Sequence, residues 1–199
     1  MGPIAGESGL TAPRLFLVAP DAPVAHLAAC LKAACAAGDV ASLLVPLAVA
    51  KELTPVAQAL GVAVLTTGEP RDAMRAGCDG LHLDAEADDI AEARNSIGKD
   101  RIIGAFAGAS RHFAMQAAEA GADYVALSQN GASIGGEPIV KWWGELAEIP
   151  CVAFDPVDVS ALDTLLPQKP DFIRPASAMW ENPDKARGIV SELMQRLKA

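Results

Sequence analysis

The sequence predicts a small, parallel, eight-stranded (β/α)8 or TIM barrel, and three observations support this fold class. Eight short apolar segments alternate with eight longer segments that are mostly rich in alanine. The apolar segments are mostly continuous rather than alternating, as in strands buried on both faces of a parallel sheet. Each strand–helix unit takes about 25 residues, which is near the minimum for this barrel. An open doubly wound sheet is the alternative, but no G-x-G-x-x-G turn favours it.

The expected elements follow one another in regular order. The strands are expected over residues 14–19, 41–45, 62–66, 80–83, 102–105, 124–127, 151–154 and 172–174. The helices are expected over residues 24–37, 48–60, 71–76, 89–97, 112–120, 139–147, 159–165 and 183–197. Alanine is the best helix former, which suits helices on the outside of a barrel.

Residues at the segment ends agree with these boundaries. Pro70 and Pro183 stand where proline is tolerated, at the beginning of a helix. Asp89 with Glu92 three residues later resembles a capping box. Three glycines follow helices, where a left-handed C-terminal cap is common: Gly61, Gly77 and Gly121.

One short phrase recurs before three of the expected strands. It reads AGCDGL at residues 76–81 and AGADYV at residues 120–125, with an echo, KPDFI, at residues 169–173. Each copy combines a helix end, a tight turn, an aspartate and a strand. In a (β/α)8 barrel the chemistry lies on the loops that follow the strands, whereas the helix-to-strand connectors contribute stability. We therefore predict that these aspartates belong to the scaffold.

The composition limits the domain organisation and the partners. Residues 1–11 lack the basic cluster and apolar run of a signal peptide, so we expect a flexible N-terminus before one barrel domain over residues 12–199. The net charge of −9 argues against nucleic acid or an anionic membrane as the main partner. No segment reaches the roughly 20 apolar residues that span a bilayer. The four cysteines form no C-x-x-C pair and are interpreted as buried hydrophobic residues in a reducing cytoplasm. A homo-oligomer is compatible with the sequence.

Six segments carry a resemblance to a known family: residues 76–83 (AGCDGLHL), 91–97 (AEARNSI), 102–104 (IIG), 121–127 (GADYVAL), 149–154 (IPCVAF) and 176–179 (ASAM). In this order they resemble the thiamine phosphate synthase and thiazole tautomerase superfamily. The resemblance implies a transferase of thiamine biosynthesis that couples a pyrimidine diphosphate to a thiazole phosphate, with Mg²⁺ as cofactor and loss of pyrophosphate. It also implies that Ser177, in the phosphate-binding motif of the last strand, contacts phosphate.

Other positions depart from the family pattern. The second strand lacks the family's basic residues and reads SLLVP at residues 42–46. The positions of the two metal-binding aspartates hold Gly68 and Ala87, so the metal ligands are not retained and we assign none. The glycines after the seventh strand are replaced by Asp155 and Pro156, which repel a phosphate and lack an N–H donor respectively. The coupling reaction is therefore doubtful, and a pseudoenzyme is one interpretation.

Several residues on the functional face are candidates for binding or chemistry. Arg174, a charge in the last strand, is expected either to pair with Asp155 across the strands or to bind an anionic ligand directly, because a lone buried charge is costly. Gly135 and Gly136 could cradle an anion, although a turn or lid is the simpler interpretation. His112 is the candidate acid–base residue, with a solvated residue at a helix start as the favoured alternative.

An acidic cluster, one histidine and a pair of tryptophans leave further alternatives open. Asp84, Glu86, Asp88 and Asp89 could hold Mg²⁺, but charge near a helix N-terminus is the favoured interpretation. His82 is predicted to be a hydrogen-bonded structural histidine.

The alternatives to the coupling reaction are a metal-independent isomerase or tautomerase that uses His112, or a non-catalytic protein. Such a protein would bind a small phosphorylated ligand or use one of the two tryptophans of residues 142–143 in a contact.

Overall fold

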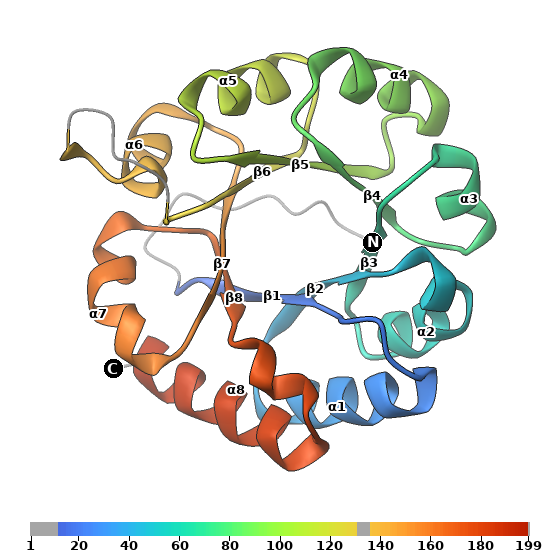
Figure 1. The fold of residues 1–199 in the computed structure, drawn as a ribbon, viewed down its shortest axis with the longest axis vertical. Helices are drawn as coiled ribbons and strands as arrows, with labels where there is room; N and C mark the ends of the chain where they lie inside the picture. The colour runs from blue at the N-terminus through green and yellow to red at the C-terminus, as the bar shows by residue number, and fades with distance from the viewer. Residues whose placement is uncertain (1–11, 131–135, 199) are drawn as a thin grey trace.

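Eight parallel strands close into a barrel in sequence order in the computed structural model, which describes residues 12–130 and 136–198 (Figure 1). The strands are β1 (Arg14–Val18), β2 (Val40–Val45), β3 (Ala63–Thr66), β4 (Gly80–Asp84), β5 (Ile102–Gly108), β6 (Tyr124–Leu127), β7 (Cys151–Val157) and β8 (Phe172–Pro175). Pairing of β1 with β8 closes the barrel. The predicted fold class is confirmed. The expected flexible segment, residues 1–11, lies outside the described residues.

The helices form a ring around the strands (Figure 1). They are α1 (Val24–Ala37), α2 (Leu47–Ala59), α3 (Pro70–Arg75), α4 (Ala87–Ile97), α5 (Arg111–Glu119), α6 (Ile139–Leu146), α7 (Leu162–Leu165) and α8 (Pro183–Leu197). Short 3₁₀ turns flank α7, namely η2 (Val159–Ala161) and η3 (Leu166–Gln168), and η4 (Ser177–Trp180) precedes α8. Proline within η3 cannot supply the amide that a longer α7 would need.

Most of the predicted boundaries agree with the structure. Pro70 and Pro183 begin α3 and α8. The glycines that follow helices, at positions 61, 77 and 121, have φ of 79°, 77° and 100°. The capping box at Asp89 is wrong: α4 begins at Ala87, and its N-cap residue Glu86 makes no side-chain capping bond.

The strands separate two hydrophobic cores because alternate side chains point to opposite faces of a sheet. The inner core fills the barrel and includes Phe16, Leu65, Tyr124, Val152 and Phe172. The larger outer core lies between the strands and the helices. All four cysteines are free thiols, three of them buried and the fourth, Cys35, half-buried.

The two adjacent tryptophans, Trp142 and Trp143, divide between the surface and the core. Trp143 is buried and donates its Nε1–H to the carbonyl of Ile149 at 3.0 Å. Trp142 is half-buried, and its ring lies under the guanidinium of Arg111, 4.7 Å from Cζ to the ring centroid. The tryptophan that remains accessible is thus covered by a cation from the neighbouring helix.

The recurring aspartates tie successive strands together at the amino-terminal end of the barrel. Asp79 accepts a hydrogen bond from the amide of Val64 at 2.8 Å. Asp123 accepts from Ile103 at 2.7 Å, and Asp171 accepts from Cys151 at 2.8 Å. Each carboxylate precedes an even-numbered strand and binds the first residues of the odd-numbered strand before it. The prediction that these aspartates belong to the scaffold is confirmed.

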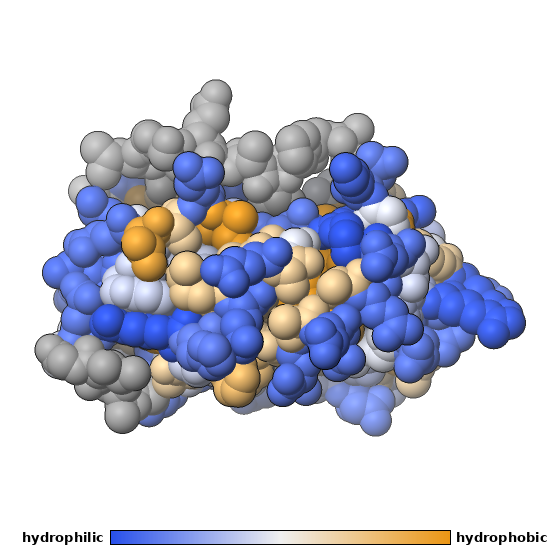
Figure 2. Space-filling view, turned by 90° about the horizontal axis from the view of Figure 1, so that it is seen from above, coloured by the Kyte–Doolittle hydropathy of each residue, from blue (hydrophilic) through white to orange (hydrophobic). Residues whose placement is uncertain are grey.

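The outer surface carries scattered rather than clustered large hydrophobic residues. Figure 2 shows the face of α4 and α5, where hydrophilic residues surround a central band of more hydrophobic ones. The exposed large hydrophobic side chains of the described residues lie on or beside three different helices: Leu47, Leu60, Phe113 and Leu146. Within residues 12–130 and 136–198, no helix is both long and apolar enough to cross a membrane.

Candidate functional site

A cavity of about 810 Å³ opens at the carboxyl-terminal end of the strands and extends between α3 and α4. Its inner wall is aromatic and is formed by His82, Phe106 and Phe154, from β4, β5 and β7. Its outer wall comes from the β3–α3 loop and the facing sides of α3 and α4: Thr67, Gly68, Glu69, Pro70, Arg71, Met74, Asp89, Glu92, Ala93, Ser96 and Ile97. The mouth is thus partly filled by side chains of the barrel interior but remains open on one side.

His82 is held rigidly at the base of the cavity. Its side chain is 5% exposed, and its Nδ1 lies 2.7 Å from the hydroxyl oxygen of Tyr124. Its ring stacks on Phe154, with 5.2 Å between centroids and 16° between planes. Burial lowers the pKa of His82 from 6.5 to about 4, so the ring is neutral near pH 7. This confirms the prediction of a hydrogen-bonded histidine and places it in the cavity wall.

Arg174 points into the mouth of the barrel. Its guanidinium lies over the ring of Phe154, 5.2 Å from the centroid, and donates to the Phe154 carbonyl at 3.3 Å. Burial lowers the pKa of Arg174, and the negative charge of Asp155 partly opposes this shift. Arginine nevertheless stays protonated in proteins, so the mouth contains a half-buried positive charge.

The predicted ion pair between Asp155 and Arg174 is not formed. Among the described residues, no nitrogen of Arg174 lies within 4.0 Å of a carboxylate oxygen. The carboxylate of Asp155 accepts instead from the hydroxyl of Ser128 at 3.0 Å and the amide of Asn130 at 3.0 Å. The segment after β6 therefore supplies the hydrogen-bond donors to Asp155, while Arg174 contacts the ring and the carbonyl of Phe154.

The remaining phosphate-site candidates lie at the rim. Ser177 is exposed in the first position of η4, and α8 is capped by Asn182 instead. Gly136 is exposed with φ of 80°, whereas Gly135 lies outside the described residues. Arg174 is therefore the candidate whose charge enters the mouth.

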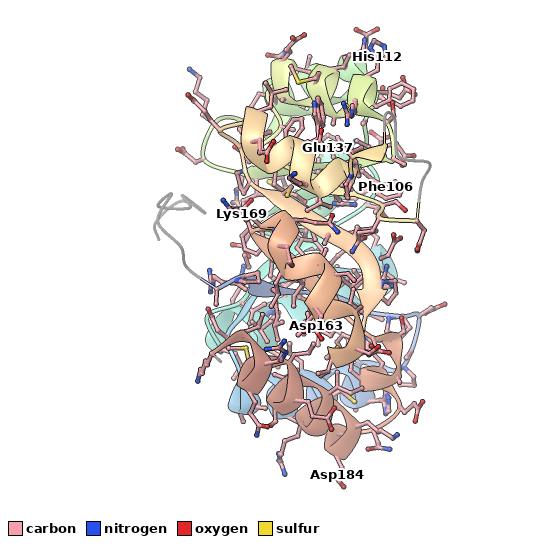
Figure 3. The ribbon with its side chains drawn as sticks, turned by 90° about the vertical axis from the view of Figure 1, so that its left-hand side faces the viewer. Phe106, His112, Glu137, Asp163, Lys169 and Asp184 are labelled. Atoms are coloured by element: carbon pink, nitrogen blue, oxygen red, sulfur yellow. The ribbon has the colours of Figure 1, made fainter. Side chains whose placement is uncertain are left out.

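His112 lies apart from the cavity. It is exposed on the first turn of α5, and its ring contacts Phe113 at 5.7 Å between centroids. Figure 3 shows His112 at the outer edge of the molecule and Phe106 nearer the barrel axis. The adjacent Arg111 forms an ion pair with Glu137 at 3.2 Å. His112 is absent from the cavity lining, and its proposed acid–base role stays a prediction.

The acidic residues near the cavity do not form a metal site. Glu69, Asp84, Asp89 and Glu92 line the cavity, but within the described part of the chain no three His, Cys, Asp or Glu side chains converge as metal ligands would. Asp89 lies in the first turn of α4, where a carboxylate interacts favourably with the helix dipole. The structure therefore shows no cage of three protein ligands among the described residues, although Mg²⁺ is usually held by one or two carboxylates together with water and substrate phosphates.

Three residues of the site were not predicted: Phe106, Tyr124 and Phe154. All three face the barrel interior, since they contribute to the inner core or pack against it. Counting alternate positions along β5, β6 and β7 would have identified them as inward-facing. That count does not reveal which of them meet at the mouth.

Comparisons with known proteins agree on one family. The model of the family described as "Thiamine monophosphate synthase" matches residues 15–174. A thiamine-phosphate synthase of Rhodospirillum centenum is 37% identical over 197 residues, covering 90% of this chain and 95% of that protein. A thiamine-phosphate synthase of Hyphomonas neptunium is 33% identical and covers 86% of this chain and 87% of that protein.

Solved structures show the same fold at lower identity. A thiamine phosphate pyrophosphorylase from Pyrococcus furiosus matches with a TM-score of 0.75 at 19% identity, over 94% of this chain and 96% of that chain. A structure described as "Native KDPGal structure" also reaches 0.75, at 16% identity over 96% of this chain and 97% of that chain. These likenesses support the barrel alone, because many chemistries share it. The sequence relatives and the family match carry the assignment further: the chain belongs to the thiamine monophosphate synthase family.

Proposed function

We propose that this family member binds a monophosphorylated heterocycle of thiamine biosynthesis at the barrel mouth and does not catalyse metal-dependent displacement of pyrophosphate. The observation that carries the proposal is the half-buried guanidinium of Arg174, which enters the mouth without a carboxylate partner among the described residues. A phosphate oxygen is a natural acceptor for such a group.

The shape and lining of the cavity support a small ligand. Its volume of about 810 Å³ falls in the range of small-molecule sites. The rings of Phe106 and Phe154 supply apolar walls for a flat heterocycle. The guanidinium of Arg174 is not part of this lining but rests on the Phe154 ring, 5.2 Å from its centroid, and so places a positive charge beside the cavity.

The electrostatics disfavour a pyrophosphate leaving group. Departing pyrophosphate needs several positive charges or a metal ion to stabilise its developing charge. The cavity is lined instead by four carboxylates, Glu69, Asp84, Asp89 and Glu92, with Arg71 as the cation of the outer wall. The second strand, Val40–Val45, carries no charged side chain.

Isothermal titration calorimetry tests the proposal with thiazole phosphate, thiamine phosphate and the pyrimidine diphosphate, each with and without Mg²⁺. We expect metal-independent binding of the monophosphates that is lost in Arg174→Ala. Arg187→Ala is the matched control, because it removes an exposed cation of α8 that does not line the cavity, and it should bind as the wild type does.

An activity assay provides the opposing outcome. The protein is incubated with both substrates and Mg²⁺, and thiamine phosphate is measured by chromatography. Formation of thiamine phosphate that depends on Mg²⁺ would overturn the proposal in favour of synthase activity. Absence of monophosphate binding would also overturn it and leave the interaction-protein alternative.

A further inference from the structure

We propose that His82 recognises the ring of the bound ligand by donating its Nε2–H to an uncharged acceptor, such as a ring nitrogen of a flat heteroaromatic compound. The inference rests on the proposed function, because it concerns the same cavity. It assigns ring recognition to His82 and phosphate recognition to Arg174.

The position of Tyr124 is imposed by its surroundings. Tyr124 is 2% exposed inside the barrel, and Gly104 on the adjacent strand β5 makes room for its ring. A Cβ atom at Gly104 would lie 1.9 Å from Tyr124 Cζ and 2.2 Å from its hydroxyl oxygen. The phenol is therefore fixed beside His82.

The hydrogen bond between the two residues selects one tautomer of His82. The Tyr124 hydroxyl has one hydrogen-bond partner among the described residues, His82 Nδ1 at 2.7 Å. If Nδ1 carried the proton, the buried phenol would accept this bond and its own O–H would lack an acceptor, which is costly. Burial raises the pKa of Tyr124 well above 10, so the phenol keeps its proton. Tyr124 therefore donates to Nδ1, and the proton of neutral His82 resides on Nε2.

The Nε2–H group is available to a ligand. His82 lines the cavity, and Nε2 has no hydrogen-bond partner in the described part of the chain. Nε2 is not fully enclosed by protein. Among the described residues, the side-chain nitrogen or oxygen atom that is fully buried without a hydrogen-bond partner is Oε1 of Gln168. The donor thus reaches cavity space rather than the packed interior.

The neutral donor and the cation share one wall. The Phe154 ring contacts both groups, with His82 stacked at 5.2 Å and the Arg174 guanidinium at 5.2 Å from the ring centroid. An uncharged N–H in an aromatic wall favours an uncharged acceptor, whereas a phosphate gains more from Arg174. A ligand with both a heterocycle and a phosphate matches this pair.

Nuclear magnetic resonance of protein labelled with ¹⁵N-histidine tests the tautomer directly. The chain has three histidines, so His82→Gln assigns the signal by its disappearance. We expect the Nε2–H tautomer at pH 7 in the wild type and a mixture of tautomers in Tyr124→Phe. If the spectrum of the wild-type protein shows the His82 proton on Nδ1, the inference is wrong.

Ligand titrations test the recognition role. Thiamine phosphate should shift the His82 Nε2 signal, whereas glycerol phosphate, which has no ring, should not. His82→Leu should bind thiamine phosphate about threefold to tenfold more weakly with unchanged affinity for glycerol phosphate, and His82→Gln, which retains a donor, should recover most of the loss. Circular dichroism and thermal unfolding of both variants check that the barrel remains folded.

The outcomes separate this inference from the proposed function. If thiamine phosphate binds through Arg174 but leaves the His82 signal unmoved, the recognition role is wrong and the proposed function stands. If neither phosphate compound binds, the proposed function fails and the recognition role fails with it.

Discussion

Replacement of Asp123 by alanine should destabilise the barrel more than any surface ion pair would suggest. The Asp123 carboxylate accepts from the buried start of β5, the amide of Ile103, at 2.7 Å, and from the Arg94 guanidinium at 2.5 Å. Loss of the first bond leaves a backbone N–H without an acceptor, at about 1–3 kcal/mol. The partly exposed ion pair adds about 0–1 kcal/mol. The two contributions add to about 1–4 kcal/mol, centred on about 2.5 kcal/mol, which corresponds to about 5–10 °C in Tm for a chain of this size.

Urea unfolding followed by circular dichroism measures this loss, and a second variant makes the measurement specific. Asp163→Ala removes an ion pair with Arg196 whose side chains are 67% and 45% exposed, and it should cost less than about 1 kcal/mol. Asp123→Asn, which keeps an oxygen acceptor for Ile103, should fall between the two. If Asp123→Ala costs no more than Asp163→Ala, the aspartates before the even-numbered strands do not tie the strands together.

Three further predictions follow from the cavity and its support. Gly104→Ala should lower the free energy of unfolding in urea by about 3 kcal/mol, because its Cβ would overlap the buried Tyr124 ring. Gly188→Ala in α8, whose Cβ meets nothing within 4 Å, should be neutral or stabilising. Equal effects of the two substitutions would contradict this packing. Asp155→Asn should tighten monophosphate binding about fivefold in calorimetry, because it removes a negative charge that acts on Arg174 and would repel a phosphate bound there, and relief of about 1 kcal/mol corresponds to about fivefold in affinity. Weaker binding would show that the carboxylate is needed. The pKa of His82 is about 4 in the folded protein and about 6.5 in the unfolded chain, so the unfolded chain binds more protons between these pH values. The free energy of unfolding therefore decreases by about 3 kcal/mol as the pH falls from about 6.5 to about 4. Urea unfolding at pH 7.5 and pH 4.5 should show this part of the loss in the wild type and not in His82→Gln; an equal loss in both would refute it.

The sequence by itself determined the elements and much of the scaffold. Continuous apolar segments located all eight strands and placed both ends to within one residue in every strand except β5 and β7, which each end three residues later than predicted. Proline at the helix starts and glycine after the helix ends worked as signals because they act through the local backbone. The recurring phrase around Asp79 and Asp123 was correctly assigned to structure because barrel topology separates connectors from functional loops.

Local sequence patterns predicted helix boundaries less reliably, because the same residues are compatible with more than one start or end of a helix. The capping box expected at Asp89 failed because α4 begins two residues earlier, at Ala87, without a side-chain cap. Residues 159–165 were predicted as one helix, but the first three of them form the 3₁₀ turn η2 and α7 begins only at Leu162. Helix ends depend on packing as well as on propensity, so such shifts are expected.

Only the tertiary structure decided which side chains meet at the mouth. His82 and Tyr124 are separated by 42 residues and lie on strands that are not neighbours, yet they form one buried hydrogen bond. Asp155 and Arg174 lie on adjacent strands, yet each has other partners, because the segment after β6 reaches the first and the Phe154 ring underlies the second. The physical reason is that strand and helix propensities act over a few residues, whereas barrel closure and side-chain packing select contacts among residues that are distant in the chain.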